Sequence, residues 1–226
     1  MLRAKRMIAD NLKKIKSQLP AHVKLVVVSK TIPANGMMEA YKAGQRIFGE
    51  NKVQELITKY QKLPKDIEWH MIGHLQSNKV KYIVPFVSLI HSVDSKKLLE
   101  AIDKEGNKIG RIIDCLLQVH IAAEETKFGF DELELEALLK SDSFKMLQNV
   151  KICGLMGMAT YTDDNFKIRK EFKRLADILN TLKLEYFGQN SSFKELSMGM
   201  SSDYQIAIES GSTIVRIGSE IFGKRN

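Results

Sequence analysis

Short apolar runs alternate with amphipathic stretches along this 226-residue chain, and this alternation restricts the fold more than any other feature. Such a pattern is typical of repeated βα units around a parallel sheet. We predict eight strands, over residues 24–29, 46–49, 68–73, 88–93, 112–121, 151–159, 195–198 and 213–217. Helices are predicted between them, among others at residues 35–43, 53–61, 95–104, 132–140, 165–182 and 203–209.

Eight strands with eight helices predict a closed (β/α)8 (TIM) barrel of the α/β class. The alternative is an open doubly wound sheet. Its first strand-to-helix turn would carry a glycine-rich phosphate loop, whereas residues 29–33 here read Ser-Lys-Thr-Ile-Pro. No linker rich in Pro, Gly or Ser divides the chain, so we predict one domain over residues 1–226.

The formal charge of +8 is concentrated near the N-terminus, where residues 1–20 hold six Lys or Arg against Asp10 alone and so contribute +5. Apolar residues recur there at helical spacing, which predicts an extra amphipathic helix with a solvated basic face. We expect this helix to cover the floor of the barrel. No aromatic residues alternate with the cations, which argues against a nucleic-acid-binding arm.

The two cysteines, Cys115 and Cys153, each lie in an apolar run without metal-binding spacing, which predicts buried, reduced thiols. No apolar run approaches the length of a membrane span. The basic N-terminus lacks the apolar segment of a secretory signal. These features together predict a soluble cytoplasmic protein without a membrane partner.

Small and polar residues follow seven of the eight predicted strands. In a barrel of this kind the ligand site lies at the carboxyl ends of the strands, so these residues should share one rim. They are Lys30, residues 49–51, 73–79, 127–130, 157–160, 199–203 and 216–219.

Lys30 directly follows a run of aliphatic residues, so its side chain should emerge from the packed barrel. Partial burial disfavours the ammonium form and provides a neutral amine that can attack a carbonyl, as a Schiff-base lysine must. The alternative is a lysine that ends a strand and extends into water.

Two rim segments predict a phosphate site. Residues 199–203 (Gly-Met-Ser-Ser-Asp) resemble a helix start, with Ser or Asp as the cap and free backbone N–H groups. Residues 216–219 (Arg-Ile-Gly-Ser) end the eighth strand, where barrels often complete such a site. Ordinary capping and turn chemistry is the alternative for each segment.

The histidines offer weaker candidates. His70 and His74 are four apart but span a strand end, so a zinc site is not predicted. His91 and His120 lie in apolar runs and are expected to be hydrogen-bonded core or rim residues. Asp114 is expected at the barrel floor.

Several motifs, in order along nearly the whole chain, resemble the YggS/PROSC family of pyridoxal-phosphate homeostasis proteins. They are VSKT at residues 28–31, FGENKVQE at 48–55, WHMIGHLQSNK at 69–79, LSMGMSSD at 196–203 and IVRIGSEIFGKR at 214–225.

The resemblance implies a fold-type III barrel, like the N-terminal domain of alanine racemase, with pyridoxal 5′-phosphate (PLP) bound as a Schiff base on Lys30. It implies that Ser201, Gly218 and Ser219 hold the phosphate, with Met200 in the same segment. Arg216 would lie beside the pyridine nitrogen and keep it unprotonated, which discourages carbanion chemistry. Asn51 and His74 would line the rim.

Racemases of this fold need a second acid/base from an added β domain, which we do not expect after the eighth unit of this chain. The resemblance therefore implies a monomeric PLP-binding protein of vitamin B6 homeostasis, with PLP-dependent apoenzymes as recipients. Two alternatives stay open: a true racemase or Schiff-base lyase that uses Lys30, and a basic module that binds nucleic acid.

Overall fold

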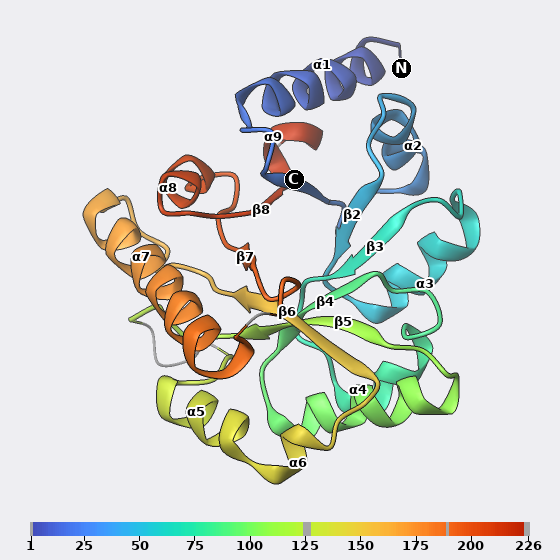
Figure 1. The fold of residues 1–226 in the computed structure, drawn as a ribbon. Coiled ribbons are helices and arrows are strands. Elements are labelled where there is room, and N and C mark those ends of the chain that lie inside the picture. The colour runs from blue at the N-terminus through green and yellow to red at the C-terminus, as the bar shows by residue number, and fades with distance from the viewer. Residues whose placement is uncertain (1, 124–127, 189, 224–226) are drawn as a thin grey trace.

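The computed structural model describes residues 2–123, 128–188 and 190–223, and its strands close into a parallel barrel in chain order (Figure 1). This confirms the (β/α)8 prediction and excludes the open sheet. The predicted strands overlap the observed ones, and the largest overruns come at carboxyl ends, where the chain turns into the loops of the rim. The strands are β1 (Lys24–Val28), β2 (Ile47–Glu50), β3 (Glu68–Met71), β4 (Leu89–Val93), β5 (Ile113–Gln118), β6 (Val150–Met156), β7 (Glu195–Ser197) and β8 (Ile214–Ile217).

Helices surround the barrel, but two units depart from the expected pattern. A short 3₁₀ segment, η1 (Ser77–Tyr82), follows β3, and the four-residue α9 (Ser219–Phe222) follows β8. A π-helical turn, η2 (Lys183–Phe187), extends α7. The other helices are α1 (Leu2–Gln18), α2 (Ala34–Lys42), α3 (Val53–Lys62), α4 (Lys96–Lys108), α5 (Glu132–Lys140), α6 (Asp142–Lys145), α7 (Asn165–Leu182) and α8 (Tyr204–Glu209).

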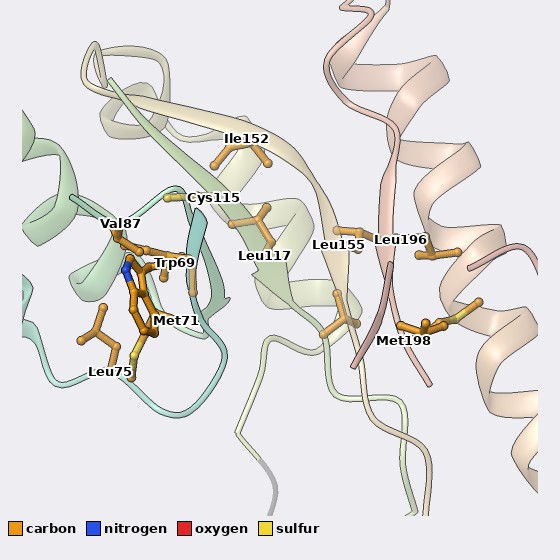
Figure 2. Close-up of a cluster of buried hydrophobic side chains, with 14 of the residues drawn as sticks. Trp69, Met71, Leu75, Val87, Cys115, Leu117, Ile152, Leu155, Leu196 and Met198 are labelled. Atoms are coloured by element: carbon orange, nitrogen blue, oxygen red, sulfur yellow. The ribbon is translucent and has the colours of Figure 1, made fainter. Parts of the chain in front are cut away.

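Buried side chains form two separate cores because successive residues of a strand face opposite sides of the sheet. Along β1, Val26 belongs to a small core in the barrel interior, whereas Leu25 and Val27 belong to a large layer between strands and helices. Figure 2 shows part of this outer layer, including Trp69 and Leu117, which are fully buried. Polar residues that interrupt either core therefore need partners.

The N-terminal helix does not cover the floor of the barrel, so that prediction is wrong. Helix α1 packs beside α2 and α9 (Figure 1), and its buried Leu12 and Ile15 join the layer outside the barrel wall. The Asn11 side chain donates to the Ile221 carbonyl of α9 at 3.1 Å. Because α9 is only four residues long, it leaves part of the outer surface of the barrel uncovered. The apolar face of α1 covers that surface.

Cys115 and Cys153 are buried and not disulfide-bonded, as predicted. Asp114 pairs with Lys151 at 2.9 Å near the amino end of β5, which agrees with its expected place at the floor. None of the helices in the described part of the chain combines the length and apolar character that a membrane crossing requires.

Candidate functional site

Lys30 follows the carboxyl end of β1, and strand pairing determines its neighbours. The partners of β1 are β2 on one side and β8 on the other. Lys30 therefore lies between the segment that carries Asn51 and the segment that carries Gly218 and Ser219. Lys30 is half-buried, which agrees with the prediction that its side chain emerges from the packed barrel.

Two glycines allow the neighbouring loops to pack closely at this rim. A Cβ atom on Gly49 would lie 2.8 Å from Val26 Cγ1. One on Gly73 would lie 2.5 Å from the Asn51 carbonyl oxygen. Such distances are too short for any side chain, so glycine lets the loop after β3 press against the half-buried Asn51.

The two predicted phosphate segments meet in the structure. The Gly218 N–H donates to Ser201 Oγ at 3.4 Å, and the Arg216 N–H donates to the Gly199 carbonyl at 3.0 Å. Ser201, Gly218 and the adjoining Ser219 and Met200 therefore belong to one cluster of hydroxyl and backbone donors at the ends of β7 and β8.

The predicted capping of α8 is wrong in detail. Helix α8 begins at Tyr204, and Asp203 at its N-cap position makes no side-chain capping bond. Asp203 Oδ1 instead accepts the Met200 N–H at 2.5 Å, within the preceding turn. Gly199, with φ of 93°, starts this turn in a conformation that favours glycine.

Arg216 is only 4% exposed and projects from β8 into the barrel interior. Its guanidinium donates to Ser197 Oγ at 2.6 Å and to the Gly157 carbonyl at 3.1 Å. Burial lowers the pKa of Arg216 to about 10, with Asp203 acting in the opposite direction. Arg216 is therefore a cation at neutral pH, at the base of the candidate site.

Ser197 links Arg216 to two histidines that sequence analysis did not connect with the site. His91 Nδ1 lies 2.9 Å from Ser197 Oγ, and His91 Nε2 lies 2.9 Å from His70 Nδ1. Burial lowers the pKa of His70 to about 3, and burial together with His70 and Arg216 lowers that of His91. Both imidazoles are therefore neutral. We call His70, His91, Ser197 and Arg216 the interior chain.

His74 lies on the rim, as expected, and apart from His70. His74 Nδ1 is 2.8 Å from Asp94 Oδ2, and its ring stacks on Phe128 with 4.2 Å between centroids. Lys127, in the predicted rim segment 127–130, lies outside the described residues. No group of three His, Cys, Asp or Glu side chains within residues 2–123, 128–188 and 190–223 is arranged to hold a metal ion.

Residues 5–226 match the family model "Alanine racemase, N-terminal domain". A protein of Aquifex aeolicus named "Pyridoxal phosphate homeostasis protein" is 43% identical over 203 residues, which covers 89% of this chain and 87% of the relative. The chain belongs to the pyridoxal phosphate homeostasis protein family. A family member from Vibrio alginolyticus is 36% identical, and the alignment covers 97% of this chain and 98% of that relative.

Solved structures agree with this family. PipY of Synechococcus elongatus, described as solved with PLP bound, is 40% identical and superposes with a TM-score of 0.87 over 96% of this chain and 100% of its own. Alanine racemase from Bartonella henselae superposes with a TM-score of 0.71 at 16% identity, over 98% of this chain but 61% of the racemase. The racemase likeness shows the shared barrel alone.

Proposed function

We propose that this protein binds PLP as a Schiff base on Lys30 and serves intracellular PLP homeostasis without turning over an amino acid. The observation that supports the proposal is that β1, which leads into Lys30, pairs with β8, which carries Arg216 and leads into the donor Gly218, in a family whose member PipY was solved with PLP.

The donor set fits a phosphate monoester. Ser201 Oγ accepts the Gly218 N–H at 3.4 Å, so its own O–H is available to donate. We assign Ser201, Gly218 and Ser219 to the phosphate and Met200 to the same wall of the site. Asn51 and His74 would line the opposite rim, beside the ring.

Lys30 would supply the covalent link. Its amine would condense with the aldehyde that PLP supplies, forming a C=N bond in place of the C=O bond with loss of one water. Bound PLP supplies a reactive aldehyde and an electron-withdrawing ring. Lys30 is half-buried, at the carboxyl end of β1.

Arg216 would limit what the bound cofactor can do. A guanidinium only donates hydrogen bonds, so beside the pyridine nitrogen it leaves that nitrogen unprotonated and weakens the ring as an electron sink. The interior chain holds the guanidinium in place through Ser197. This arrangement favours storage and transfer of the cofactor over amino-acid chemistry.

We further propose that the protein acts in the cytoplasm as a monomer and delivers PLP to PLP-dependent apoenzymes. The names of its relatives refer to homeostasis rather than to a reaction, which favours this role over a racemase or Schiff-base lyase. The absence of stacking aromatics in the basic segment disfavours nucleic acid.

Replacing Lys30 tests the site. Lys30→Ala should abolish the adduct trapped by borohydride while it leaves the melting temperature nearly unchanged, because a rim residue contributes little to the core. Peptide mass mapping of reduced protein provides the measurement, and Lys62→Ala, an exposed lysine of α3, is the control. A full adduct on another lysine in Lys30→Ala would refute the assignment.

The absence of turnover needs its own test. Incubation with single-enantiomer amino acids, followed by separation of the enantiomers, should show no conversion at enzyme-like rates. Steady conversion that Lys30→Ala eliminates would instead establish the enzymatic alternative. A protein that takes up no PLP but binds RNA with steep salt dependence would establish the nucleic-acid alternative.

A further inference from the structure

A buried cluster of charged residues lies directly behind Lys30, on the outer side of the barrel wall. Glu50, the last residue of β2, is 0% exposed although it faces the apolar layer between strands and helices. Its Oε1 accepts a hydrogen bond from Ser29 Oγ at 2.6 Å and another from Lys59 Nζ at 2.7 Å. Glu50 is thus tied to the residue that precedes Lys30.

Lys59 of α3 contacts every other residue of this cluster. It is only 7% exposed, and its ammonium group donates to three oxygens: the Ser29 carbonyl at 2.7 Å, Glu50 Oε1 at 2.7 Å and Glu55 Oε2 at 3.2 Å. An ammonium group has three N–H donors, so these contacts use its full capacity. We call Glu50, Glu55 and Lys59 the outer cluster.

Glu55 connects the outer cluster to the residue that follows Lys30. The Thr31 N–H donates to Glu55 Oε2 at 2.8 Å. Thr31 has φ of 65°, the one positive φ of a non-glycine residue in the described part of the chain. For a β-branched residue this conformation is strained, so a specific contact is needed to hold it.

The carboxylate of Glu55 suits this task. Burial works to raise its pKa, but the hydrogen bonds from Thr31 and Lys59, together with the charges of Lys59 and Lys52, leave the pKa of Glu55 lowered. Glu55 therefore stays ionised and accepts the Thr31 N–H with the strength of a charge-assisted bond.

Both neighbours of Lys30 are consequently held by the same three side chains. Ser29 is held through its carbonyl and hydroxyl, and Thr31 through its N–H. The Ser29 side chain faces outward, toward Glu50, away from the interior core that contains Val26. Lys30 follows in the turn at the carboxyl end of β1.

We propose that Glu50, Lys59 and Glu55 are positioning residues that fix the backbone on either side of Lys30 and so hold its amine at the mouth for attack on an aldehyde. The inference rests on the proposed function of Lys30. The outer cluster lies across the barrel wall from the site, so it reaches the cofactor through the backbone that it holds, above all on either side of Lys30.

Glu55→Ala is the sharpest test, because Glu55 is less buried than its two partners and its loss should not unfold the protein. We expect the rate at which Lys30 becomes trappable by borohydride, after PLP is mixed in, to fall about tenfold. A misplaced nucleophile commonly costs a factor of this order or more. Glu55→Gln keeps an acceptor oxygen and should recover most of the rate, and Gln54→Ala, at an exposed position of the same helix, is the control.

A second comparison separates positioning from a general structural role. In the Lys30→Ala background PLP can bind only noncovalently, and there Glu55→Ala should leave the dissociation constant within about twofold, because the amine through which it acts is absent. A general loosening of the site would weaken binding in both backgrounds.

The outcomes are distinct. A slowed covalent step with preserved noncovalent affinity supports the inference. An unchanged covalent rate in Glu55→Ala, or an equal loss of noncovalent affinity, overturns it while Lys30 remains the attachment site. Trapped adduct in Lys30→Ala itself would overturn the proposed function instead.

Discussion

The interior chain and the outer cluster are both buried and polar, yet they handle charge differently. The interior chain has two neutral imidazoles and a serine that lead to one cation, Arg216, without a carboxylate in direct contact. In the outer cluster one cation, Lys59, faces two carboxyl groups. The first arrangement leaves positive charge for a ligand at the mouth, whereas the second pairs its cation with its own carboxyl groups and acts through the backbone that it holds.

This difference predicts which cluster is more sensitive to removal of a charge. Lys59→Met would leave the fully buried Glu50 without its cation, and breaking a buried ion pair typically costs about 3–5 kcal/mol. Urea denaturation should show a loss of that size. Lys62→Met, an exposed position of the same helix, should change stability by less than about 0.5 kcal/mol.

A loss below about 1 kcal/mol in Lys59→Met would break the comparison. It would mean that Glu50 takes up a proton when the cation is removed. Burial, opposed by the hydrogen bonds from Lys59 and Ser29, already raises the pKa of Glu50, so a stability loss that shrinks at acidic pH is expected in this variant.

The interior chain should be less sensitive. Ser197→Ala removes one hydroxyl and leaves His91 Nδ1 and one Arg216 nitrogen without that partner. A buried polar group left unsatisfied costs about 1–3 kcal/mol, so we expect a loss of about 2 kcal/mol by urea denaturation. Ser17→Ala, at an exposed position of α1, is the control. A loss as large as that of Lys59→Met would remove the distinction between the two clusters.

Much of the rim was predictable from sequence because its polar residues follow apolar strands directly. Lys30, Asn51, His74 and Ser201 all stand out in this way, whereas Arg216, predicted with the rim segment 216–219, lies within β8 and is buried in the barrel interior. Strand pairing then brings their segments to one end of the barrel, which a closed parallel topology requires.

The two buried clusters were not predicted, because the contacts that define them form only through the register of the barrel. The members of the interior chain come from four different strands. The outer cluster spans only residues 50–59, but it contacts Ser29 and Thr31 of the preceding unit. A local signal does exist for the outer cluster. Val53, Leu56 and Lys59 lie at helical spacing on the buried face of α3, so Lys59 occupies a position where an apolar residue is expected. Glu50 similarly occupies an outward position of β2, next to the buried Phe48 two residues earlier.

The position of α1 was predicted wrongly for a related reason. Its pattern of apolar residues indicates that one face is buried but not against which surface. The vacancy in the outer wall beside the short α9 is a property of the whole barrel, and no local pattern in residues 2–18 reports it.

The smallest expected effect concerns the protons of the interior chain. His70 has a pKa of about 3 in the folded protein against an ordinary value of 6.5. Below pH 6.5 the unfolded chain therefore binds a proton that the folded protein does not, so stability falls as the pH drops from 6.5 toward 3. One such histidine costs about 1.4 kcal/mol per pH unit at most.

His70→Gln should remove this contribution, so its stability should decline less than that of the parent between pH 7 and pH 5.5 in urea titrations. His22→Gln, at an exposed position before β1, should retain the parental slope. Identical slopes for His70→Gln and the parent would mean that the interior chain accepts a proton in the folded state. It would then carry a second charge beside Arg216, and the contrast with the outer cluster would no longer hold.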